Sequence, residues 1–418
     1  MTIEVTRLES GLTVATDRMD SVETVSIGAW VGVGTRHEAP EVNGVAHLLE
    51  HMAFKGTARR SAQAIAEEIE AVGGQMNAYT GRESTAFYAK VLAGDMPLAL
   101  DVIADILQHS LFDEQELCRE RAVVLQEIGQ AVDTPDDIIF DHFQETAYPG
   151  QAIGRPVLGR AEIVSALGRD SLCDYLRRFY GPERVVVAAA GRLEHAEVVA
   201  LAAQAFDALP GNGAVAPEAA SYRGGDFRED RELEQVHLVL GFDAVSYLAP
   251  EYYPAMVLST LFGGGMSSRV FQEVREKRGL VYSIYSFVSS YRDGGLFGIY
   301  AGTGANEVEE LVPVVCEELG KLGESIQQVE LERARAQLKA SILMGRESSG
   351  TRAEQLAQQL LVYGRPLSVE EVVAKIEAVT CETMSALARR LTAARPTLAV
   401  LGPLERVESF DRLAARFS

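Results

Sequence analysis

Apolar residues recur with strand or helix periodicity along most of the chain, and the same order of predicted elements occurs twice. The first half contains a strand at Thr24–Val33, helices around 43–55 and at 61–73, strands at 75–80 and 84–91, a helix at 95–109 and a further helix from near Asp113. The second half contains a strand at Gln235–Gly241, helices at 250–262 and Met266–Lys277, strands at Val281–Ser289 and Gly294–Ala301, and helices at 305–322 and 327–345. This repeat predicts two similar domains related by internal duplication. Because strands and helices do not alternate strictly, we expect an α+β fold with largely antiparallel sheets packed with helices.

A stretch rich in glycine, proline and alanine separates the two halves. It runs from Pro210 to Asp226 and has no hydrophobic periodicity, which is typical of a connecting segment. We therefore expect an N-terminal domain at 1–210, a linker at 211–228 and a C-terminal domain at 229–418. A length of 418 residues suits two domains better than one.

Composition restricts the classes of partner. The formal net charge of −21 argues against nucleic acid, whose binding requires neutralisation of phosphates by Lys and Arg. No apolar run approaches the roughly 18 residues of a membrane-spanning helix, and the first residues lack the pattern of a secretory signal, so we expect no membrane partner and a cytoplasmic location. The cysteines lie far apart in the sequence, so we expect them to be reduced thiols, as is usual in the cytoplasm. They are Cys118, Cys173, Cys316 and Cys381.

The segment from Asn43 to Phe54 carries the strongest chemical signal. His47 and His51 are spaced i, i+4, so a helix places them one above the other, with Glu50 beside them. Two imidazoles at this spacing can bind one zinc ion, and the glutamate can reach water in an open coordination position; the order H-x-x-E-H is that of the inverted zinc peptidases. Asn43 is the expected N-cap of this helix. The alternative is a set of solvated ion pairs or satisfied core groups.

A catalytic zinc needs a third protein ligand from another element. Glu120 and Glu127 are spaced i, i+7 on a predicted helix and therefore share one face. One of these carboxylates can bind the metal while the other orients a histidine by accepting its second ring N–H.

The segments Gly44–Thr57, Gly73–Tyr88 and Glu120–Asp137 resemble the pitrilysin/insulysin family of zinc peptidases, most closely the short-chain branch of mitochondrial processing peptidases and their bacterial relatives. In that family a ligand glutamate lies 76 positions after the second histidine, with another glutamate seven residues earlier, and Glu127 and Glu120 fill both positions. The resemblance implies a zinc endopeptidase with one Zn²⁺ per chain, held by His47, His51 and Glu127. It further implies that Glu50 activates the attacking water.

The resemblance also suggests substrate-binding residues. Asn77, Ala78 and Tyr79 match an exposed edge strand to which the peptide adds as a further strand; from the residues alone, this is an ordinary half-buried strand. The pair Arg275 and Tyr282 matches residues that hold the scissile carbonyl, whereas composition alone would place Arg275 on a solvated basic face. Between them, Gly279 is the expected turn that ends the helix.

Acidic residues after Glu127 suggest a preference for basic peptides. Asp137 and Asp141, with the neighbouring Asp136, match positions that hold an arginine in processing peptidases, although a solvated acidic face explains them as well.

Longer relatives fuse two such chains into a closing chamber. We therefore expect peptide substrates and a homodimer in which the second domain of one subunit completes the active site of the other. The alternative is an inert or half-active assembly subunit of the same fold.

Overall fold

The computed structural model describes residues 3–209 and 216–417, which form two compact units. Unit 1 comprises Met1–Gln130, Arg155–Glu218 and Met344–Pro366, and unit 2 comprises Ala131–Gly154, Ala219–Leu343 and Leu367–Ser418. Each unit is a twisted sheet with helices on both faces, which places its apolar residues between layers.

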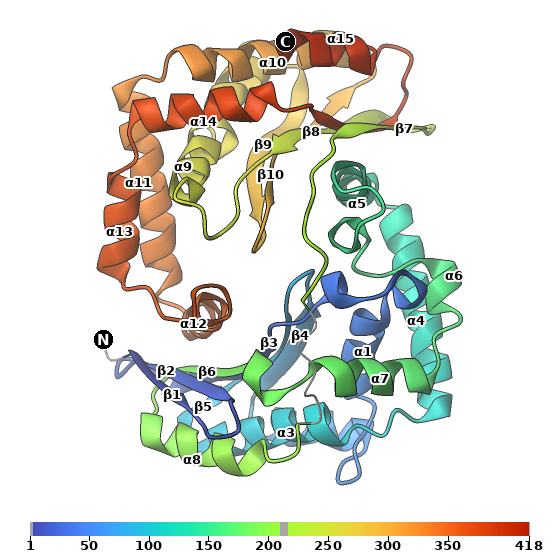
Figure 1. Ribbon diagram of the computed structural model, residues 1–418, viewed down its shortest axis with the longest axis vertical. Coiled ribbons are helices and arrows are strands. Elements are labelled where there is room, and N and C mark those ends of the chain that lie inside the picture. The colour runs from blue at the N-terminus through green and yellow to red at the C-terminus, as the bar shows by residue number, and fades with distance from the viewer. Residues whose placement is uncertain (1–2, 210–215, 418) are drawn as a thin grey trace. The chain divides into compact units, whose positions relative to one another are not determined.

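Unit 1 is built on a sheet with the strand order β1-β2-β6-β3-β5-β4 (Figure 1). Its strands are β1 (Ile3–Arg7), β2 (Thr13–Arg18), β3 (Thr24–Val31), β4 (Gln75–Thr80), β5 (Thr85–Leu92) and β6 (Val185–Gly191). Its helices are α1 (Val45–Ala53), α2 (Ala62–Ala71), α3 (Met96–His109), α4 (Glu114–Val132), α6 (Ala161–Val164), α7 (Arg169–Phe179), α8 (His195–Ala205) and α12 (Ser349–Tyr363). All neighbouring strands pair antiparallel except β2 and β6, and β4 lies at one end of the sheet.

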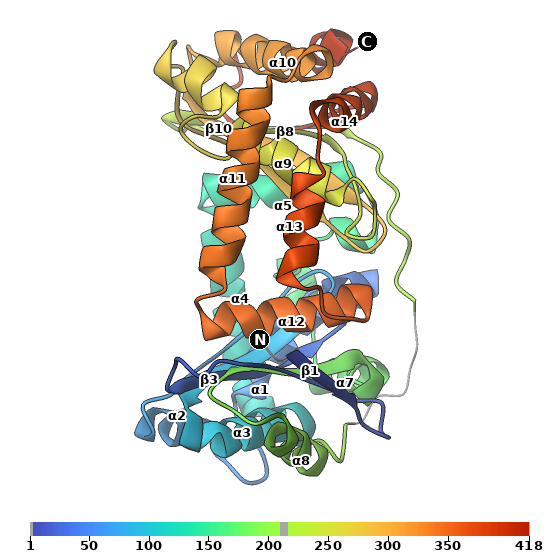
Figure 2. The same cartoon turned by 90° about the vertical axis from the view of Figure 1, so that its left-hand side faces the viewer.

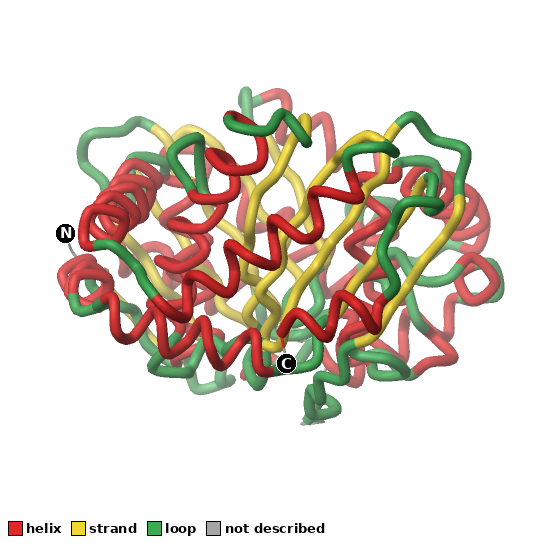
Figure 3. The backbone as a smooth tube through the Cα atoms, turned by 90° about the horizontal axis from the view of Figure 1, so that it is seen from above, coloured by secondary structure: helices red, strands yellow, loops and turns green. Residues whose placement is uncertain are grey.

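Unit 2 has the strand order β7-β11-β8-β10-β9, which repeats the order β2-β6-β3-β5-β4 of unit 1 without a counterpart of β1 among the described strands. Its strands are β7 (Gly225–Asp230), β8 (Gln235–Asp243), β9 (Val281–Ser290), β10 (Gly295–Gly304) and β11 (Thr397–Gly402). Its helices are α5 (Pro135–Ala147), α9 (Tyr252–Gly263), α10 (Val308–Glu324), α11 (Gln328–Gly345), α13 (Val369–Glu377), α14 (Cys381–Ala393) and α15 (Phe410–Ala414). Figure 3, seen from above, shows helices lying across the strands. A single parallel pair, β7 with β11, takes the place of β2 with β6, so the prediction of two similar, largely antiparallel α+β domains is confirmed.

The two units exchange one helix each. Helix α12, from late in the sequence, packs on β2, β3 and β6 of unit 1, on the face opposite α3 and α8 (Figure 2). Helix α5, from the first half, packs on β7, β8 and β11 of unit 2. The units are therefore discontinuous, unlike the expected continuous domains 1–210 and 229–418, because packing on a sheet face does not require neighbouring sequence. In the expected linker at 211–228, the first residues lie outside the described ranges and the last residues belong to β7.

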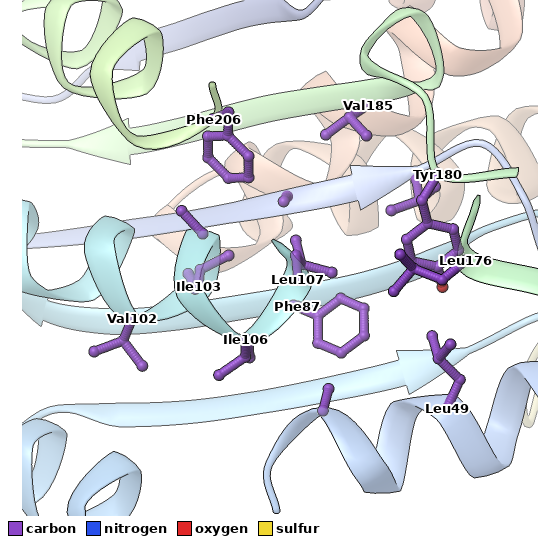
Figure 4. Packing of buried hydrophobic residues seen from close by; sticks show 14 of the residues in the cluster. Leu49, Phe87, Val102, Ile103, Ile106, Leu107, Leu176, Tyr180, Val185 and Phe206 are labelled. Atoms are coloured by element: carbon purple, nitrogen blue, oxygen red, sulfur yellow. The ribbon is translucent and has the colours of Figure 1, made fainter. Parts of the chain in front are cut away.

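The main core of unit 1 lies between its sheet and helices α1, α3, α7 and α8. Figure 4 shows Phe87 of β5 next to Ile106 and Leu107 of α3, with Leu49 of α1 on the other side of Phe87. Leu48, Leu49 and Met52 are almost completely buried, so the apolar face of α1 is fixed against the sheet and its His/Glu face is held in one orientation.

Within the described residues, no helix combines the length and apolar character required to cross a membrane.

Candidate metal centre

Helix α1 begins with an arrangement that differs from the one expected. Its N-cap is Gly44, in a left-handed conformation with φ 98°, and the expectation that Asn43 is the N-cap is wrong. The buried carboxylate of Glu38 takes over the capping role and accepts hydrogen bonds from the Gly44 N–H at 2.9 Å and the Ala46 N–H at 2.8 Å. Asn43 instead donates to Glu38 at 2.8 Å and to the Pro156 carbonyl at 3.2 Å. A glutamate from a preceding loop thus accepts from two of the backbone N–H groups at the start of α1.

The segment after α1 is held by a buried aspartate of α3. Asp105 accepts hydrogen bonds from the Thr57 hydroxyl at 2.8 Å, from Arg60 at 2.9 Å and from Arg59 at 3.1 Å. The side chain of Asp105 is fully buried and that of Arg60 is nearly so. Both ends of α1 are therefore held by carboxylates from elsewhere in unit 1.

Replacement of Asp105 by asparagine should lower the free energy of unfolding by about 2 kcal/mol, because it removes the fully buried carboxylate that Arg59 and Arg60 share. Arg60 keeps its ion pairs with Asp101 and Glu68. Burial raises the pKa of Asp105, but hydrogen bonds from Thr57, Arg60 and Arg59 outweigh burial and hold it below the usual 3.8. A depressed pKa stabilises the fold above the unfolded value, and this contribution is lost as the pH falls through the folded value.

Urea denaturation should thus show the full difference between wild type and Asp105→Asn at neutral pH and a shrinking difference below pH 3.8. The exposed Asp207→Asn is the matched control and should leave stability within about 0.5 kcal/mol of wild type. Equal stability of the two variants would contradict the anchoring role.

His47 and His51 of α1 come together with Glu127 of α4, and of the three side chains that of Glu127 is the most exposed. One ligand atom from each lies within 4.8 Å of the others. Glu127 Oε2 is 3.7 Å from His47 Nε2 and 3.5 Å from His51 Nε2. Two donors about 2.1 Å from one tetrahedral ion lie about 3.4 Å apart, so the carboxylate and both imidazoles fit a single zinc ion.

The charge state of His47 and the contacts of His51 also suit a metal. Burial, together with the neighbouring His51, lowers the pKa of His47 to about 4, so its ring is neutral and has a free lone pair. His51 Nδ1 is 3.1 Å from Glu120 Oε2, and Glu120 Oε1 is 2.6 Å from Lys55 Nζ. When the Glu120 carboxylate accepts the Nδ1–H of His51, Nε2 of the ring faces Glu127 as an acceptor. Glu120 therefore contacts His51 without joining the ligand cluster, and its role in orienting this histidine stays a prediction.

Glu50 is oriented by the neighbouring strand. Its Oε2 accepts a hydrogen bond from the Thr80 hydroxyl of β4 at 2.5 Å. Burial raises the pKa of Glu50 and Glu127 raises it further, whereas Thr80 and His51 lower it; the net shift is upward. A carboxylate with a raised pKa accepts a proton more readily than an ordinary glutamate near neutral pH.

Asn77, Ala78 and Tyr79 lie in β4, the strand at the end of the sheet in the described part of unit 1. The Ala78 N–H donates to the side-chain oxygen of Asn77 at 2.8 Å and so does not pair with β5. In an antiparallel strand, the N–H and C=O of one residue point to the same edge. The backbone of Ala78 therefore faces the free edge, where a further strand would pair.

Arg275 and Tyr282 lie together in unit 2. Arg275 is in a π-helical segment, Phe271–Glu276, which is shorter than the helix expected at Met266–Lys277. Its guanidinium lies 6.0 Å from the ring centre of Tyr282 on β9, whose side chain is 77% exposed. Gly279, with φ 66°, forms the expected turn, because its N–H bonds to the Arg275 carbonyl at 2.9 Å.

Asp137 and Asp141 lie on α5, in unit 2, whereas the metal ligands lie in unit 1. Burial raises the pKa of Asp137, and the like charges of Asp141 and Asp136 raise it further. The acidic face is therefore present as expected, and its function as a binding site remains a prediction.

Three residues that serve the centre were not identified from the sequence: Glu38, Lys55 and Thr80. Thr80 shares the face of Ala78 by alternation along β4, and this pattern is the one signal that could have found it. Glu38 is six residues before Gly44, beyond the reach of any local capping rule, and its role depends on the loop path.

The paired imidazoles and the distant carboxylate make up the donor set of a zinc site, with the carboxylate of Glu50 on the same helix as the imidazoles. Residues 13–161 match the family model for insulinase (peptidase family M16), and residues 166–338 match the peptidase M16 inactive domain. An uncharacterized zinc protease of Streptomyces coelicolor is 41% identical, with 99% of this chain and 92% of the relative covered. The chain belongs to peptidase family M16, the pitrilysin/insulysin family, in its short-chain branch.

Further relatives agree with this placement. The uncharacterized zinc protease YmxG of Bacillus subtilis is 38% identical over 94% of this chain and 97% of its own. A probable mitochondrial-processing peptidase subunit beta of Arabidopsis thaliana is 36% identical over 99% of this chain and 80% of its own. A solved protease from Helicobacter pylori shares the fold at a TM-score of 0.90 and 21% identity, covering 96% and 99% of the two chains.

Proposed function

We propose that the protein is a zinc-dependent endopeptidase that hydrolyses peptides or unfolded segments. The observation that carries this proposal is the convergence of His47, His51 and Glu127, with the carboxylate of Glu50 on the same helix. His47 Nε2, His51 Nε2 and a carboxylate oxygen of Glu127 would hold the metal. Bound zinc lowers the pKa of coordinated water towards about 7 and polarises a carbonyl group.

The residues around the metal site supply the general base, orient one histidine and bind the peptide backbone. Glu50, held by Thr80, takes a proton from the attacking water and passes it to the leaving amine, so that no covalent intermediate forms. Glu120 fixes the ring orientation of His51 through the Nδ1 contact. The free edge of β4 binds the peptide backbone at Ala78, next to Thr80 and hence next to the base.

The oxyanion is stabilised from unit 2. Arg275 and the exposed Tyr282 supply N–H and O–H donors of the kind that a developing negative charge needs. We propose that the enzyme is a homodimer and that this pair acts on the active site of the partner subunit. We also propose that Asp137 and Asp141 favour basic peptides, as in a processing peptidase, through charge-assisted contacts.

Metal content and cleavage test the proposal together. Purified protein should contain about one zinc ion per chain and cleave an unfolded, internally quenched basic peptide. A chelator should abolish cleavage, and stoichiometric Zn²⁺ should restore it.

The outcomes separate the alternative functions. Zinc without cleavage of any peptide would indicate an inert assembly subunit, and cleavage only after addition of a second, different chain would indicate a half-active subunit. Undiminished cleavage by metal-free protein would contradict the proposal.

A further inference from the structure

Unit 1 contains a pocket of about 460 Å³ behind β4, between the sheet and the first turn of α12. The rings of Trp30, Tyr79 and Tyr88 form its wall, with centroids 6.4 Å apart for Trp30 and Tyr88 and 6.3 Å apart for Tyr79 and Tyr88. Gly350 and Thr351 of α12 lie across from these rings. The described catalytic groups do not line this pocket.

The pocket and the metal lie on opposite faces of the same strand. Ala78 packs towards the core that contains α1, and Thr80 reaches Glu50. Tyr79 instead packs with the cluster that contains residues of α12 and donates a hydrogen bond to Glu354 at 3.2 Å. This separation follows from the two-residue period of a strand.

In a peptide that pairs with the free edge of β4, successive side chains would also alternate between the two faces of the sheet. Side chains beside Ala78 and Thr80 would point to the metal face, and those beside Asn77 and Tyr79 would point to the pocket face. Asn77, which pairs with Tyr88, has a short and exposed side chain, so it does not block a substrate side chain that extends from the free edge of β4 to Tyr88. Only a long side chain of the substrate can extend from the free edge of β4 to Tyr88.

The lining indicates which side chain fits. Lys90 and Glu354 supply one charge of each sign, so the pocket attracts neither acidic nor basic groups strongly. Aromatic rings pair favourably with other rings at the centroid separations found in this wall. Resting on the proposed peptidase function, we propose that this pocket is a specificity pocket that receives an aromatic side chain of the substrate, from a residue that points away from the metal.

Quenched peptides that differ at one residue, scanned along both sides of the cleaved bond, test this proposal. At a position facing the pocket, Phe or Tyr should raise kcat/KM over Ala by about 10-fold or more, whereas Lys and Glu should not. Binding of the same peptides to Glu50→Gln protein, followed by fluorescence anisotropy, should show the same order. This second measurement reports on the pocket without requiring turnover.

Gly350→Leu should abolish the preference by filling the pocket. A Cβ at Gly350 would meet only Ser348 Oγ at 3.6 Å and Ser26 Oγ at 3.8 Å, so the backbone accepts a side chain there. Gly320→Leu on α10 is the matched control, since a Cβ there meets nothing within 4 Å, and it should keep the wild-type ratio of Phe to Ala. Thr351→Leu, at the next pocket residue, gives a second test should Gly350→Leu fail to fold.

Two results would overturn the pocket assignment and leave the peptidase intact: cleavage without an aromatic preference, or a preference that both pocket variants retain. Absence of cleavage by the zinc-loaded wild type would instead contradict the proposed function. The anisotropy ratio, with and without the pocket variants, would then decide whether the pocket binds aromatic side chains.

Discussion

Replacement of Glu50 by glutamine is expected to lower kcat/KM by about 1,000-fold while the protein keeps its zinc. Glutamine has the same size and still accepts the hydrogen bond from Thr80, but it cannot take the proton of the attacking water. The ligand atoms on His47, His51 and Glu127 are unchanged, so metal binding should persist. Peptide cleavage and metal analysis of the same preparation measure both parts.

The exposed Glu70→Gln on α2 is the matched control for this change and should behave like wild type. Cleavage at the wild-type rate by Glu50→Gln would refute the role of general base. Loss of zinc from Glu50→Gln would show that this carboxylate holds the metal site together, contrary to the ligand assignment.

Mixing two inactive chains is expected to restore activity. Arg275→Ala should lose about 100-fold or more in kcat because an oxyanion donor is removed. If Arg275 acts on the partner's metal site, half of the dimers in an equal mixture with Glu50→Gln are mixed, and one of the two sites in each has both groups intact. About a quarter of wild-type activity should therefore return, as an isologous dimer requires.

Cleavage rates measured over a series of mixing ratios test this prediction, after the dimers have been allowed to exchange subunits. Activity should peak at equal amounts and fall on either side. Failure to recover activity at every ratio, although native mass spectrometry shows mixed dimers, would contradict action between subunits. Full activity of Arg275→Ala by itself would remove this residue from the mechanism.

Short-range rules account for what could be predicted. The histidine pair of α1 follows from helical periodicity, because residues i and i+4 share a face wherever the helix is placed. The turn at Gly279 follows from the tolerance of glycine for positive φ. The third ligand, Glu127, was singled out through the family spacing, since local physics could not choose between it and Glu120.

Long-range contacts explain what could not be predicted. The ion pair of Glu120 with Lys55, at 2.6 Å, depends on how α4 lies against the end of α1, and no pattern in the sequence indicated it. The cap of α1 depends on the path of the loop that brings Glu38 to the Gly44 N–H, which displaced Asn43 from its expected role.

By itself, the sequence determined the class of chemistry, the helix that carries the two histidines and the repeated α+β architecture, because each depends on the periodicity or spacing of residues along the chain. Only the tertiary structure decided how Glu38 caps α1, how Thr80 orients the base and where α5 and α12 pack. It alone also revealed the aromatic pocket behind β4. Each of these features joins residues that are far apart in sequence, and their proximity arises when apolar faces are buried together during folding.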